Sequence, residues 1–144
     1  MNSLQERKSV RLVLFLAVVY LVLGLGFAEL ARESSTNPTI WRRLAWVFSA
    51  VAFAGHIGYE QFRLGNPGQT VATHVSFAAA LGALGLAVSA NVHELLGAAS
   101  YRGRLAVALV AWPVLIAIPA FVVAMVATAV LKRWSRRSKT RHLA

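Results

Sequence analysis

Three ionisable side chains near the middle of the chain, His56, Glu60 and His74, have types and spacing that suit the binding of a proton or a metal ion. His56 and Glu60 are four residues apart, so a helix would carry them on one face, one turn from each other. Glycine and proline at residues 65–68 predict a turn, and an antiparallel return from that turn would bring His74 to a similar depth. Two imidazoles and one carboxylate gathered there could hold a divalent metal ion or exchange a proton.

The same residues also have interpretations in which nothing is bound. Glu60 can form an ion pair with Arg63, one turn away, at the membrane interface. The two imidazoles can then hydrogen-bond to Tyr59, Thr73 or a backbone carbonyl. Haem b ligated by the two histidines is a third interpretation, although contacting helices pack about 8–10 Å apart and leave little room for a macrocycle. A structural role, proton or metal binding, and haem ligation all stay open, and no motif singles out a cofactor.

A second polar cluster is expected at the opposite end of the helices, from Glu29, His93 and Glu94. If the helices that carry these residues touch, the carboxylates would meet nearby arginines in interfacial ion pairs, which stabilise a protein only weakly. The alternative interpretation of this cluster is a site for a substrate or a quinone headgroup.

The elements that must position these residues are four long apolar segments. Of the 144 residues, 58% are hydrophobic and 14% are charged, whereas a soluble domain is roughly half apolar and a quarter charged. A membrane-spanning helix needs about 20 mostly apolar residues, and segments of that kind cover residues 12–31, 38–64, 70–96 and 105–131. Short connections make successive helices antiparallel. We therefore expect an all-α integral membrane protein, a single membrane domain folded as a four-helix transmembrane up-down bundle.

Small residues and prolines indicate how these helices pack. Residues 70–96 are dense in alanine and glycine, which let neighbouring backbones approach closely in a membrane, so we expect this helix at the centre of the bundle. Pro113 and Pro119 predict a bend in the last helix, because each removes a hydrogen bond and crowds the preceding turn.

The basic residues predict the orientation and location of the chain. Its formal net charge is +10. Ten of the fifteen Lys and Arg residues flank the ends of the segments that would share a side with both termini, and five flank the other ends. Because cytoplasmic loops carry an excess of Lys and Arg, both termini are expected in the cytoplasm, with the chain a multi-pass protein of the cell inner membrane. A cleaved signal peptide is the rival interpretation of the first segment, although its apolar stretch is longer than usual.

A basic tail at residues 132–144 follows the last segment directly. At the inner face of a membrane, such a tail predicts contact with anionic headgroups, at about 1 kcal/mol for each basic residue. Nucleic-acid binding is disfavoured, because the tail is short and matches no binding motif. The residues expected to anchor to lipid are Lys132, Arg133, Arg136, Arg137, Lys139 and Arg141.

Missing residue types and motifs narrow the function further. The chain has no cysteine and no aspartate, which excludes thiolate chemistry and aspartate-based catalysis. No hydrolase, nucleotide-binding or zinc-protease motif occurs. The sequence thus predicts a non-enzymatic membrane-embedded interaction or accessory subunit, in a homo-oligomer or a larger membrane complex. The alternative is a redox or transport component that binds a metal ion, a proton or haem at His56, Glu60 and His74.

Overall fold

The computed structural model of the chain is all-helical over the residues that it describes, whose backbone covers 3–34, 37–96 and 102–141. Side chains are described for 6–34, 37–92, 107 and 109–135. Four α-helices and one short π-helix follow one another along the chain: α1 Ser3–Glu33, α2 Pro38–Gly58, η1 Tyr59–Arg63, α3 Gly68–Leu96 and α4 Arg102–Arg141.

The connections between these helices follow from local sequence signals. α2 begins directly after Asn37 with a proline in its first turn, where a missing N–H costs no hydrogen bond. α2 then passes into η1, whose wider turn is closed by the bond from the Leu64 N–H to the Tyr59 carbonyl at 3.2 Å. Gly65 follows with a φ of +66°, a left-handed conformation that glycine adopts without a steric penalty. The predicted segment 38–64 is therefore α2 and η1 together, with the expected turn after it.

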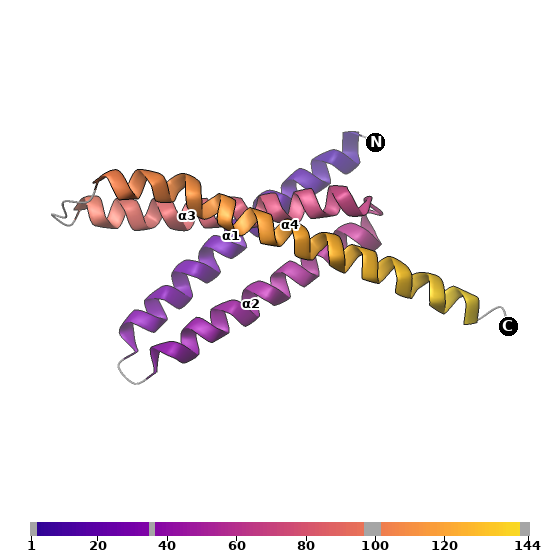
Figure 1. Cartoon of the computed structure of the whole chain (residues 1–144), viewed down its shortest axis with the longest axis horizontal. Coiled ribbons are helices and arrows are strands. Elements are labelled where there is room, and N and C mark those ends of the chain that lie inside the picture. The colour runs from indigo at the N-terminus through magenta and orange to yellow at the C-terminus, as the bar shows by residue number, and fades with distance from the viewer. Residues whose placement is uncertain (1–2, 35–36, 97–101, 142–144) are drawn as a thin grey trace.

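The helices form two antiparallel hairpins that cross each other, α1 with α2 and α3 with α4 (Figure 1). α3 packs against α4 along its length and crosses α1, which agrees with the central position that its small residues predict. α2 contacts α3 only sparsely. The hairpins are therefore splayed, and the arrangement is more open than a closed bundle of four parallel axes. Pro113 and Pro119 lie inside α4, which continues as one helix through both.

α1 and α3 run in the same direction, and they approach each other closely where they cross. Near the start of α1, the Ser9 Oγ accepts a hydrogen bond from Asn66 Nδ2, just before α3 begins, at 3.3 Å. Further along both helices, a Cβ added to Gly82 would lie 2.6 Å from the Tyr20 Cβ, so only glycine permits this approach. The start of α1, the end of α4 and the α2–α3 connection lie at one end of the molecule, and the α1–α2 connection lies at the other (Figure 1).

The core is small, and most large apolar side chains lie on the outside. One buried cluster joins α2, α3 and α4 through Ile57, Val75 and Ala124, and a second joins α1 to α3 through Val13 and Ala78. Large apolar residues are exposed along every helix, as expected where lipid tails replace water.

Three of the helices are long and apolar enough to cross a membrane: Glu6–Glu33 of α1, Gly68–Val92 of α3 and Leu109–Ser135 of α4. α2 does not reach the same apolar character among the described residues. Arg42 and Arg43 lie near its start and His56 near its end, and these polar side chains lower its hydropathy. The chain is therefore a helical protein with three candidate membrane-spanning helices.

Candidate functional site

The side chains of His56, Glu60 and His74 meet at the end of the molecule where α2 turns into α3. The Nδ1 of His74 lies 2.9 Å from Oε1 and 3.0 Å from Oε2 of Glu60. The Nε2 of His56 approaches Oε1 of Glu60 to 3.6 Å. The Glu60 carboxylate therefore lies between the two imidazoles, and the three residues form one cluster across the α2–α3 turn.

The cluster has two buried members and one that is partly exposed. Glu60 and His56 are fully buried, whereas the His74 side chain is 26% exposed. The buried carboxylate needs partners, because an ionised carboxylate without them is very costly to remove from water. His74 supplies one hydrogen bond to it. The cluster thus reaches from the surface, at His74, to a fully buried imidazole, at His56.

Asn66 and Ser9 complete the surroundings of Glu60. The Nδ2 of Asn66 donates to Glu60 Oε2 at 2.7 Å and to Ser9 Oγ at 3.3 Å. The Asn66 backbone N–H also donates to the Glu60 carbonyl at 3.1 Å. The sequence offered no signal for Ser9, which precedes the first apolar stretch and is 57 residues from Asn66. Asn66 is a typical turn residue, and its side chain here also fixes the carboxylate and ties α1 to the turn.

The expected ion pair between Glu60 and Arg63 is not formed. Glu60 is fully buried, whereas Arg63 is exposed. The cause is η1, because each residue of a π-helix advances the chain through a smaller angle than in an α-helix. Residues three apart therefore no longer lie next to each other on the surface. Tyr59 and Thr73 do not bind the imidazoles either: Tyr59 is exposed, and the Thr73 hydroxyl donates to the Gln69 carbonyl at 3.0 Å.

His56 is the unusual member of the cluster. Neither of its ring nitrogens has a hydrogen-bond partner among the described residues, although the side chain is fully buried. A buried polar group in that state costs about 1–3 kcal/mol. A proton taken up by His56 would create a cation 3.6 Å from the Glu60 carboxylate, and the ion pair would offset part of this cost. His56 is thus a fully buried imidazole whose nearest charged group is the Glu60 carboxylate.

The same geometry does not suit a metal ion or haem. No group of three His, Asp or Glu side chains in the part of the chain with described side chains is arranged to hold a metal ion. The Glu60 carboxylate itself occupies the space between the two imidazoles. Haem iron would need one imidazole nitrogen on each side, and here the nitrogens of His56 and His74 face the same Glu60 oxygen. Gly82 of α3 packs closely against α1, whereas Gly55 and Gly58 of α2 have open space around them.

The second predicted cluster is placed only in part. Glu29 pairs with Arg32 at 2.7 Å, and both side chains are more than half exposed. The end of α1 that carries them lies apart from the end of α3 (Figure 1). The side chains of His93 and Glu94 lie outside the described residues, so a cluster that contains them stays a prediction.

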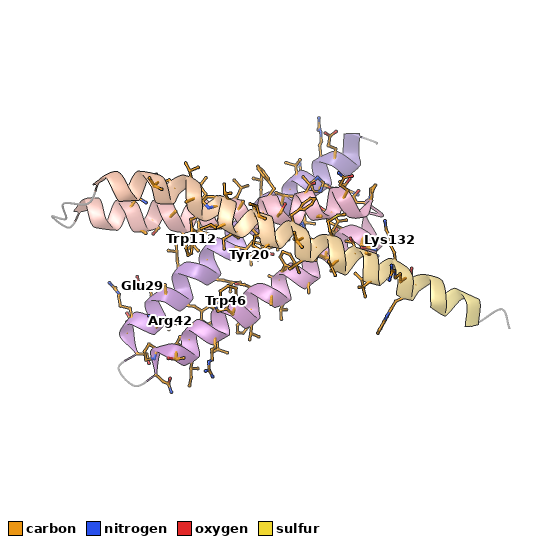
Figure 2. All side chains as sticks on the ribbon, viewed as in Figure 1. Tyr20, Glu29, Arg42, Trp46, Trp112 and Lys132 are labelled. Atoms are coloured by element: carbon orange, nitrogen blue, oxygen red, sulfur yellow. The ribbon has the colours of Figure 1, made fainter. Side chains whose placement is uncertain are left out.

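The basic tail continues α4 as a helix to Arg141. Lys132 and Arg133 are exposed on it, and Figure 2 shows Lys132 on the part of α4 that extends beyond its contact with α3. The side chains of the remaining tail residues that are expected to anchor to lipid lie outside the described residues: Arg136, Arg137, Lys139 and Arg141.

No protein-family model matches the chain, and neither a curated protein nor a solved structure matches it significantly.

Proposed function

We propose that the chain crosses the cell inner membrane four times, with both termini in the cytoplasm. The directions of the helices support four crossings. α1 and α3 run the same way, so the chain between them has to return across the bilayer, and α2 with η1 is the segment available to do so. The excess of Lys and Arg at the end that holds the termini supports the orientation.

Single-cysteine labelling tests this topology directly, because the chain has no cysteine of its own. Asn37→Cys, at the α1–α2 connection, is expected to react with a membrane-impermeant maleimide added outside the cell. Gln69→Cys, at the exposed start of α3, is expected to react only after the membrane is permeabilised. Reaction of both from the same side would contradict the return of α2.

We further propose that the protein is a non-enzymatic membrane subunit whose Glu60 cluster takes up and releases a proton. The observation that carries this proposal is the buried Glu60 carboxylate shared by two imidazoles, one of them fully buried without a hydrogen-bond partner. His74 is the member in contact with the surroundings. The proton is exchanged at His74 and is shared through Glu60 with His56, where it forms an imidazolium paired with the carboxylate.

The partners proposed for this subunit follow from its surface. Exposed Lys132 and Arg133 suit anionic headgroups at the cytoplasmic face. The long apolar surface of α4 that α3 leaves uncovered suits lipid tails or a further membrane helix, in a homo-oligomer or a larger complex. The chemistry of the cluster does not depend on which of these covers α4.

Infrared spectroscopy of the protein in vesicles, as a difference between two pH values, tests proton binding. The wild type is expected to give a carboxylate difference band that Glu60→Gln removes. Glu29→Gln, which alters an exposed carboxylate, is the matched control and is expected to keep the band. A Glu60→Gln spectrum equal to that of the wild type would contradict the proposal. Stoichiometric Zn²⁺ binding by the wild type and not by His56→Phe would identify a metal site instead.

A further inference from the structure

A groove between α1 and α2, at the end of the molecule away from Glu60, has a volume of about 480 Å³. That volume is in the range of small-molecule sites, about 300–1,000 Å³. It is lined by small residues, among them Gly24, Ala28 and Ala45, and by the aromatic residues Phe27 and Trp46. This part of the lining is apolar, as an acyl chain requires.

Two arginines make the end of the groove nearest the α1–α2 connection basic. Arg32 and Arg42 both line it, and Figure 2 shows Arg42 and Trp46 on α2, with Glu29 on the side of α1 that faces away from them. Glu29 neutralises Arg32 at 2.7 Å. Arg42 is exposed and has no carboxylate partner among the described side chains, and the sequence holds no acidic residue between Glu33 and Glu60. The groove therefore carries an uncompensated positive charge where it meets the membrane surface.

Aromatic contacts hold Phe27, one of the residues that line the groove, against α2. The Phe27 ring stacks on Phe48 of α2 at 5.5 Å between centroids and lies 6.5 Å from Trp41. Trp46, which also lines the groove, is 75% exposed, and tryptophan prefers the depth of the lipid headgroups. An apolar groove with an unpaired arginine at one end has the chemistry to hold an anionic phospholipid, with its phosphate at the arginine and one acyl chain along the groove.

We propose that this groove is a binding site for an anionic phospholipid of phosphatidylglycerol type, with Arg42 holding the phosphate and one acyl chain lying between Phe27 and Trp46. The proposal is independent of proton binding, because the groove and the Glu60 cluster lie at opposite ends of α2. A zwitterionic phospholipid has the same chains and phosphate but no net charge. It would therefore gain less from the excess positive charge of Arg42.

Quenching of Trp46 by lipids brominated on the acyl chain tests the proposal. The protein is prepared with its other three tryptophans changed to phenylalanine and is placed in vesicles of phosphatidylcholine. Brominated phosphatidylglycerol, added in increasing amounts, is expected to quench Trp46 at lower mole fraction than brominated phosphatidylcholine. Arg42→Gln is expected to weaken the preference about fivefold, which corresponds to about 1 kcal/mol for one basic residue at a membrane surface. Arg43→Gln, the same change of charge at a neighbouring exposed residue outside the groove, is expected to keep the preference.

A second pair of variants tests whether the chain enters the groove. Ala28→Leu adds a large side chain to the lining of the groove and is expected to reduce quenching by both brominated lipids. Ala50→Leu adds the same side chain to an exposed position of α2 outside the groove and is expected to leave it unchanged. Circular dichroism of all four variants shows that they remain folded. Equal quenching by the two lipids, equal effects of Arg42→Gln and Arg43→Gln, or full quenching in Ala28→Leu would each overturn the proposal.

Discussion

Glu60→Gln is the substitution for which the structure predicts the largest effect on stability. The carboxylate accepts hydrogen bonds from His74 Nδ1 and Asn66 Nδ2 and lies 3.6 Å from His56 Nε2. An amide of the same shape keeps one oxygen but places an NH₂ group against one of these donors. Removing one partner of a buried ion pair costs about 3–5 kcal/mol. We expect Glu60→Gln to lower the free energy of unfolding by about 3 kcal/mol, the lower end of this range, because the amide keeps one acceptor oxygen.

Reversible unfolding with sodium dodecyl sulfate in mixed micelles, followed by circular dichroism, measures this loss. Glu29→Gln is the matched control, because the pair of Glu29 with Arg32 is exposed and such pairs contribute little. The double variant Glu60→Gln/His74→Phe completes a thermodynamic cycle. It is expected to be less destabilised than the sum of its single variants, because both remove the same hydrogen bond.

One result would refute this reasoning. If Glu60→Gln unfolded at the same detergent fraction as Glu29→Gln, the carboxylate would not be buried between the two imidazoles. The hydrogen bonds assigned between Glu60 and the side chains of His74 and Asn66 would then be wrong as well.

Three further predictions, tested by the same unfolding measurement, concern the helix packing, the α2–α3 turn and the relative strength of the two histidine contacts with Glu60. His74→Phe is expected to lower the free energy of unfolding more than His56→Phe does, because Nδ1 of His74 is 2.9 Å from the Glu60 carboxylate while Nε2 of His56 is 3.6 Å away. The reverse order would contradict the geometry. Gly82→Ala is expected to lower the free energy of unfolding by about 1–3 kcal/mol, because its Cβ would lie 2.6 Å from a Cβ of α1. Gly26→Ala is the control: its Cβ would meet open space, and no loss of stability is expected. Gly65→Ala is expected to cost about 1–2 kcal/mol because of its φ of +66°, and an unchanged stability would rule out this turn conformation.

The assembly of the cluster could be anticipated because it depends on local spacing. His56 and Glu60 are one helical turn apart. Gly65 and its neighbours indicate a turn, and counting residues on both sides of that turn places His74 at a depth similar to that of His56. Helical structure followed in the same way from the long apolar segments. These features arise from interactions within a helix or across one turn, which the order of residues encodes directly.

Features that depend on exact turn geometry or distant contacts could not be anticipated. The predicted ion pair between Glu60 and Arg63 was wrong because η1 inserts a wider turn. The five residues of η1 carry no sequence feature that distinguishes a π-helix from an α-helix. Ser9 was missed because its bond to Asn66 depends on how α1 crosses the start of α3. The sparse contact between α2 and α3 has a similar cause, because small residues show that a helix packs closely and do not show against which neighbour.

The most direct test of proton binding at Glu60 is nitrogen NMR of the imidazoles, with ¹⁵N-labelled histidine in vesicles, as the pH is changed from mildly acidic to mildly alkaline. The chain has four histidines, and the variants His56→Phe and His74→Phe assign the signals of these two. We predict that the change of pH alters the ring-nitrogen signals of both His56 and His74, and that Glu60→Gln uncouples the two responses. A His56 ring that keeps one protonation state throughout, or a Glu60→Gln spectrum with unchanged His56 and His74 signals, would contradict proton binding by this cluster.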